Sequence, residues 1–136
     1  DLNIRLIRQK VNTIPIPPDS VLLDSRQGTE SQHPDSRCWV SYNKRVYASD
    51  TLSFEEVLRW YKDKIDSREW NGPVWYSDRL LAFGSSEKVE LSVSDEYRFV
   101  VFPNINTREE ELRHKTLFLV ELSRRADTAM TAEACT

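Results

Sequence analysis

The chain has 136 residues, of which 39% are hydrophobic and 30% charged, and its formal net charge is −3. This length and balance fit one globular domain with a core of its own. A small negative charge without a long basic block gives nucleic-acid binding little electrostatic support. No run of about 18 apolar residues is present, so we expect any membrane attachment to lie in sequence outside this chain.

The first 18 residues predict a leader or linker that precedes the domain. Several prolines in this stretch fix φ and bias the residues before them away from the helical region. We therefore expect a single domain over residues 19–125. Its first elements are predicted to be a short strand over 20–24, a loop over 25–37 and a β-rich strand over 37–48.

Residues 53–68 carry the clearest signal of secondary structure, an amphipathic helix. Ser53 followed three residues later by Glu56 is the capping-box pattern. Five apolar residues then recur at helical spacing and form one stripe: Phe54, Val57, Leu58, Tyr61 and Ile65. The sequence Asn71-Gly72-Pro73 predicts the end of this element.

The rest of the chain is rich in β-like segments. Val89, Leu91 and Val93 alternate with polar residues, as in a half-buried antiparallel strand. The runs 97–102 and 116–122 are more continuously apolar, and we expect both in the centre of a sheet. Residues 103–115 predict a solvated loop or short helical turn, and residues 126–136 a flexible tail.

Together these elements predict an α+β fold. The expected architecture is a two-layer sandwich in which one main helix packs on an antiparallel sheet of about five strands. A helix on one face would leave the other face of the sheet to water or to a partner.

Four aromatic residues are the candidate binding residues of this chain. Trp60 lies about 120° from the centre of the helical stripe, so it either folds over the sheet edge, covers the proline-rich leader, or anchors a partner. Trp39, Trp75 and Tyr76 lie on predicted strands, whose alternation sends some side chains to each face. If several meet on the uncovered face, they form an apolar patch.

The two cysteines, Cys38 and Cys135, are either free thiols or a disulfide that ties the tail to the domain. A disulfide would imply an oxidising compartment. His33, Asp35 and Cys38 lie close together in sequence, but Pro34 and the lack of a second ligand cluster argue against a metal site. We therefore predict neither a metal nor a cofactor.

No catalytic motif emerges from the residues. The serines lack the G-x-S-x-G setting of a nucleophile elbow, and the three glycines are isolated turn positions rather than a phosphate loop. The acidic run Glu109-Glu110-Glu111 is typical of a solvated face. These observations favour a protein that is not an enzyme.

The region around the predicted helix resembles a recurrent type of small bacterial extracytoplasmic domain, found in lipoproteins and after membrane anchors. The shared pattern is an aromatic-containing strand, a Ser/Thr-rich turn, a helix of the form E-E-V-x-x-x-Y, a tryptophan and several strands. The residues that carry it are Tyr47-Ala48-Ser49-Asp50, Ser53, Glu55-Glu56-Val57, Tyr61, Ile65 and Trp70. The resemblance implies a location outside the cytoplasm in association with a membrane. Domains of this type are mostly of uncharacterised function, so it implies no catalytic residue.

The leading hypothesis from the sequence is a noncatalytic binding domain whose partner is a protein or another envelope component. One alternative is a small ligand-binding protein or enzyme with its site between helix and sheet, which predicts a concave pocket with a shifted carboxylate or histidine. Another is an immunity or inhibitor protein, for which compactness and acidity also fit.

Overall fold

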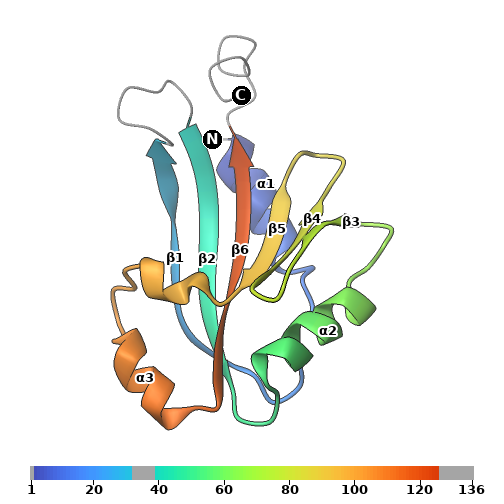
Figure 1. Ribbon diagram of the computed structural model, residues 1–136. Coiled ribbons are helices and arrows are strands. Elements are labelled where there is room, and N and C mark those ends of the chain that lie inside the picture. The colour runs from blue at the N-terminus through green and yellow to red at the C-terminus, as the bar shows by residue number, and fades with distance from the viewer. Residues whose placement is uncertain (1, 32–38, 126–136) are drawn as a thin grey trace.

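The computed structural model describes residues 2–31 and 39–125 (Figure 1). Its helices are α1 (Leu2–Val11), α2 (Phe54–Lys64), the 3-10 helix η1 (Glu96–Phe99) and α3 (Thr107–Arg113). Its strands are β1 (Val21–Ser31), β2 (Trp39–Ser49), β3 (Asn71–Tyr76), β4 (Leu80–Gly84), β5 (Glu90–Ser94) and β6 (Thr116–Arg125).

The described strands form one antiparallel sheet in the order β1-β2-β6-β5-β4-β3. The α+β class and the antiparallel sheet are therefore confirmed. The expected counts are not: within the described residues the sheet has six strands rather than five, and three α-helices rather than one main helix accompany it. The first and last strands of this order, β1 and β3, are the two edges of the sheet.

The main hydrophobic core lies on the face of the sheet that α1 and α2 cover. Alternation along β6 sends Phe118, Val120 and Leu122 to this face, and Tyr47 of β2 stacks on Phe118 with ring centroids 5.5 Å apart. From α2 the buried side chains are Val57, Leu58 and Tyr61. Three of the five residues of the predicted helical stripe are thus buried, and Phe54 and Ile65 pack against the same cluster.

Helix α2 begins as its sequence predicts. The Ser53 hydroxyl accepts a hydrogen bond from the Glu56 backbone N–H at 3.2 Å, and the Glu56 carboxylate accepts one from the Ser53 N–H at 3.0 Å. This reciprocal pair satisfies two backbone donors that the first turn leaves without partners. Regular helix ends at Lys64, earlier than the predicted residue 68, and turns lead from there to Trp70.

Residues 1–18, expected to be a leader, contribute a helix that packs on the sheet. Ile7 of α1 is fully buried, and Ile14 of the proline-rich stretch is 8% exposed; both belong to the main core. The buried Lys10 makes ion pairs with Glu69 and, at 2.7 Å, with Glu87. Although burial lowers the pKa of Lys10, hydrogen bonds and charge from the two carboxylates raise it above 10.5 overall.

A second, smaller core lies on the opposite face of the sheet, under the segment that connects β5 to α3. Tyr97 and Phe102 of this segment pack on Val46, Ala48, Leu117 and Leu119. The prediction of a central strand over 97–102 is wrong: these residues form η1 and an irregular stretch that crosses in front of the sheet toward β1 (Figure 1). A short, mostly apolar run such as this one does not specify a period, so strand and short helix are not distinguished by it.

Residues 100–106, which connect η1 to α3 and which we call the crossing segment, are attached to β1 through Asp24. Its carboxylate accepts hydrogen bonds from the Asn104 backbone N–H at 2.8 Å and from the Asn104 side-chain amide at 3.0 Å. Burial raises the pKa of Asp24, but the hydrogen bonds from Asn104 and Ser25 outweigh it and lower the pKa below its ordinary value.

Two further expectations meet different outcomes. Residues 25–31, predicted as loop, continue strand β1, which pairs with β2 from Val21 to Ser31. Polar residues are tolerated there because an edge strand leaves most side chains in water. Residues 103–115 contain the short helix α3, as one of the two predictions for that stretch had it, and His114 after it contacts Asp50 at 3.1 Å and Glu110 at 3.3 Å.

Candidate binding surface

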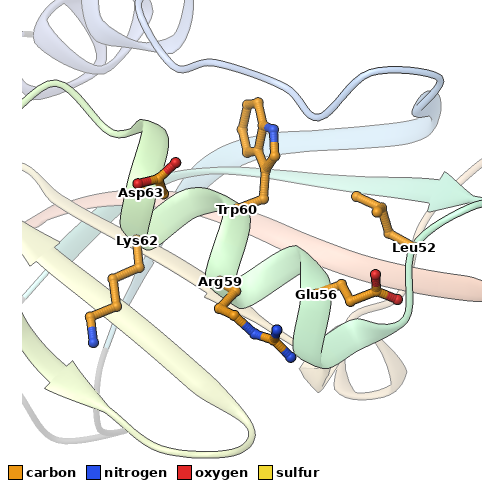
Figure 2. A pocket seen from close by; sticks show the side chains of 6 residues that line it. All are labelled: Leu52, Glu56, Arg59, Trp60, Lys62 and Asp63. Atoms are coloured by element: carbon orange, nitrogen blue, oxygen red, sulfur yellow. The ribbon is translucent and has the colours of Figure 1, made fainter.

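Trp60 occupies an intermediate position on α2. Its indole packs against the main core and meets the Tyr61 ring edge-on, with centroids 5.1 Å apart. Figure 2 shows the indole on one side of the helix, with the Arg59 and Lys62 side chains on the other. Packing against the main core therefore accounts for the partial burial of Trp60.

A broad, open hollow of about 610 Å³ extends over the outer surface of α2. We call it the α2 hollow; its lining residues are Leu52, Glu56, Arg59, Trp60, Lys62 and Asp63 (Figure 2). Its charges are mixed. Glu56 is held ionised because hydrogen bonds from the Ser53 backbone and side chain lower the pKa of its carboxyl group, and Arg59 pairs with Glu55 at 3.1 Å. Such a surface can contact a partner. Its carboxylates have other roles, because Glu56 caps the helix and Asp63 is exposed to solvent.

The strongest exposed aromatic surface lies on strand β3. All six residues of β3 are exposed, and Val74, Trp75 and Tyr76 retain 62%, 60% and 49% of their accessible surface. We call these three residues the β3 edge. Elsewhere in the same domain Tyr47, Tyr61 and Trp70 are at most 5% exposed. The β3 edge therefore exposes large side chains of the kinds that the fold buries elsewhere.

Lys62 connects the α2 hollow with the β3 edge. Its ammonium nitrogen lies 4.7 Å from the centroid of the Tyr76 ring, a cation–π distance, and Lys62 is also one of the residues that line the hollow. Tyr76 pairs with Leu81, whose side chain lies in the main core, so Tyr76 is on the face that α2 covers. Trp75 pairs with Ala82 and is directed to the opposite face. A partner that binds the edge of the sheet can contact both.

Trp39 is not part of this surface. It is 51% exposed, but it begins β2 opposite Ser31, and β6, β5 and β4 separate β2 from β3. Of the four residues singled out from the sequence, Tyr76 lies beside Lys62 and Trp75 is next to Tyr76 on the strand. The Trp60 indole lies on the side of α2 away from Lys62 (Figure 2), and Trp39 lies apart.

A small cavity lies between the sheet and the segments that cover it, and described residues line it. Its volume is about 10 Å³, enough for roughly one water molecule. Val11, Ile14 and Ile16 close it on the helix side. This cavity does not support the alternative of a substrate site between helix and sheet.

The structure also exposes apolar residues that the sequence analysis did not single out. Phe99, Val101 and Leu112 are 87%, 76% and 89% exposed on η1, the crossing segment and α3. The apolar run 97–102 predicts a buried strand, not an exposed apolar surface. Tyr97 and Phe102 at the two ends of this run are buried, whereas Phe99 and Val101 between them are exposed.

Other predictions fall outside the described residues. Cys38 and Cys135, expected to be free thiols or a disulfide, lie there. So do His33, Asp35 and Cys38, the cluster for which no metal site is predicted. Within residues 2–31 and 39–125, no three histidine, cysteine, aspartate or glutamate side chains gather in a way that could hold a metal ion. In the same ranges, no helix has the length and apolar character needed to cross a bilayer.

Comparisons with known proteins give no match: no protein-family model, curated protein or solved structure is similar enough to this chain.

Proposed function

We propose that the protein is a noncatalytic binding domain that docks a protein or another envelope component through the β3 edge. The observation that carries this proposal is the exposure of the whole strand, including Trp75 and Tyr76. Exposed tryptophan and tyrosine offer large contact areas at a small loss of rotamer entropy, and they are enriched among residues that dominate binding energy.

The surroundings of the edge support docking. An edge strand presents backbone N–H and C=O groups that no neighbouring strand uses, and partners often pair with such groups. Lys62 adds a positive charge beside Tyr76, and the α2 hollow adds a concave surface next to it. A partner with an extended apolar segment and an acidic group would find complementary contacts at each of these positions.

Site-specific photo-crosslinking in the native cells tests the proposal. A photoreactive phenylalanine analogue replaces Trp75 in one variant, Trp39 in a second and the exposed Ser86 in a third. We expect a discrete covalent adduct from position 75 that unlabelled protein competes away, and no such adduct from positions 39 and 86. The same adduct from all three positions, or none from position 75, would contradict docking at β3.

We also propose, from the sequence resemblance, that the domain works outside the cytoplasm next to a membrane. A lipobox or a transmembrane segment encoded upstream in the same reading frame is the expected finding. An upstream sequence that encodes neither would remove the support for this location.

A further inference from the structure

The other edge strand of the sheet, β1, carries opposite charges at equal distances before and after Gly28. Among the described strands, β1 pairs only with β2, so its outer edge has unpaired backbone donors and acceptors over most of its length. Arg26 and Glu30 lie two residues before and two residues after Gly28, on the same face of the strand. Such a strand is complementary to a reversed copy of itself.

We propose that β1 is a self-association edge, at which two copies of this chain pair antiparallel with Gly28 opposite Gly28. In that register Arg26 of each copy lies opposite Glu30 of the other, and Gln27 lies opposite Thr29. Opposite charges and hydrogen-bonding side chains are favourable cross-strand pairs. The two-fold symmetry makes every favourable pair occur twice.

Registers with the two-fold axis at Gln27 or Arg26 are less favourable. Opposed side chains in a continuous sheet share a face, so the two-fold axis must pass through a residue. An axis at Gln27 places Asp24 opposite Glu30, and an axis at Arg26 places Arg26 opposite itself; each puts like charges together. Registers closer to Leu22 meet the bulge between Leu22 and Asp24 and the attached crossing segment.

The charges within one copy also favour this pairing. Arg26 lies directly opposite Lys44 on β2, a like-charge pair, while Lys44 reaches Glu30 at 3.6 Å. The Glu30 side chain keeps 54% of its surface exposed, so it can accept a second cation. Glu30 of the second copy would provide Arg26 with the anion that its own sheet does not place opposite it.

Gly28 itself contributes no side chain at the centre of the pairing. A Cβ atom there would lie 2.9 Å from the Tyr42 hydroxyl, whose ring covers the glycine. The Arg26 guanidinium lies 6.0 Å from the centroid of the same ring. Because β3 is at the far end of the sheet, a pair joined at β1 carries a β3 edge at both ends. The self-association is independent of the function proposed for β3.

A charge-reversal experiment tests the register. Arg26→Glu alone gives two acidic groups opposite each other in both pairs, and Glu30→Arg alone gives two basic groups. We expect each variant to self-associate at least about tenfold more weakly than the wild type. An equimolar mixture of the two restores opposite charges in both pairs, so it should associate as the wild type does. Arg5→Glu, at an exposed position on α1, is the matched control and should leave association unchanged.

The measurement is sedimentation velocity from about 1 µM to about 1 mM, the range of weak interfaces, with circular dichroism as the folding check. A wild type that stays monomeric throughout, variants that associate normally, or a mixture no better than its components would each overturn the proposal. If a variant does not fold, amide hydrogen exchange of the wild type decides instead. Exchange over residues 25–31 that slows with concentration supports the pairing, and exchange independent of concentration overturns it.

Discussion

Lys10 is the residue at which α1 is held most specifically to the rest of the domain. Its ammonium group reaches Glu69 before β3 and Glu87 before β5, and it lies 5.2 Å from the centroid of the Trp70 ring. The lysine side chain is 6% exposed, whereas those of Glu69 and Glu87 are 39% and 47% exposed. The carboxylates can therefore return to water when the lysine is replaced.

For this reason we expect Lys10→Met to lower the free energy of unfolding by about 1–3 kcal/mol, less than the loss of a fully buried pair. Methionine leaves an apolar side chain of similar length at this position and removes the ammonium charge together with its hydrogen bonds. Urea unfolding followed by tryptophan fluorescence measures the change. Lys64→Met, at an exposed pair with Asp63, is the control and should cost less than about 0.5 kcal/mol. Equal effects of the two substitutions would contradict the role of Lys10.

The contribution of Glu121 to the stability of the fold is expected to depend on pH. Burial raises the pKa of its carboxyl group, Lys44 lowers it, and Glu30, Glu90 and Glu96 raise it further. A carboxyl group whose pKa is raised by folding favours the folded state when it is protonated, so its ionisation destabilises the fold as the pH rises.

We therefore expect Glu121→Gln to raise the thermal midpoint at neutral pH. The gain should shrink as the pH falls toward 4.5, the ordinary value for glutamate, because the wild-type carboxyl group is then protonated too. Thermal unfolding of both proteins across this pH range tests the expectation. A variant that is less stable than the wild type at pH 7 would show that the carboxylate makes a net favourable contact.

At the scale of elements, α1 and the crossing segment turn a sheet with one helix into a domain covered on both faces. Ile7 is fully buried in the main core, whereas Leu2 of the same helix is 61% exposed. We expect Ile7→Ala to lower the free energy of unfolding by about 2–5 kcal/mol and Leu2→Ala to change it by less than about 0.5 kcal/mol. A dispensable leader would give two small effects in the same denaturation experiment.

The attachment of the crossing segment to β1 makes a separate prediction. Asp24→Ala removes both hydrogen bonds to Asn104. We therefore expect the free energy of unfolding to fall by about 1–3 kcal/mol and amide exchange over residues 95–106 to become faster. Because the pKa of Asp24 is lowered by folding, its contribution is present above pH 3.8 and is lost as the pH falls through the lowered value. Asp78→Ala, at an exposed turn, is the control. Unchanged exchange over 95–106 in Asp24→Ala would rule out this attachment.

At the scale of the whole molecule, the fold class was predictable wherever local chemistry is decisive. Ser53 and Glu56 specify a helix start through backbone donors that must be satisfied, and the alternation at Val89–Val93 marks a strand with one buried face. The edge strand β1 and the run 97–102 were misread because tertiary pairing, not local pattern, decides their structure.

The candidate surface was predictable only in part. Composition and position on the helical wheel drew attention to Trp60, Trp75, Tyr76 and Trp39, but strand order decides which of them are neighbours. No sequence pattern indicated that Lys62 lies beside the Tyr76 ring, because that contact joins residues on different elements. The exposure of β3 along its whole length is likewise a property of its place at the end of the sheet.

The most direct test of the central claim is the affinity of the partner captured at position 75 for purified variants of this chain. Trp75→Ala and Tyr76→Ala should each weaken binding by about tenfold or more, because exposed aromatic residues at an interface contribute a large share of its energy. Trp39→Ala, which replaces another exposed tryptophan on the distant half of the sheet, should bind like the wild type. Wild-type affinity in both β3 variants, with all of them folded, would contradict docking through the β3 edge.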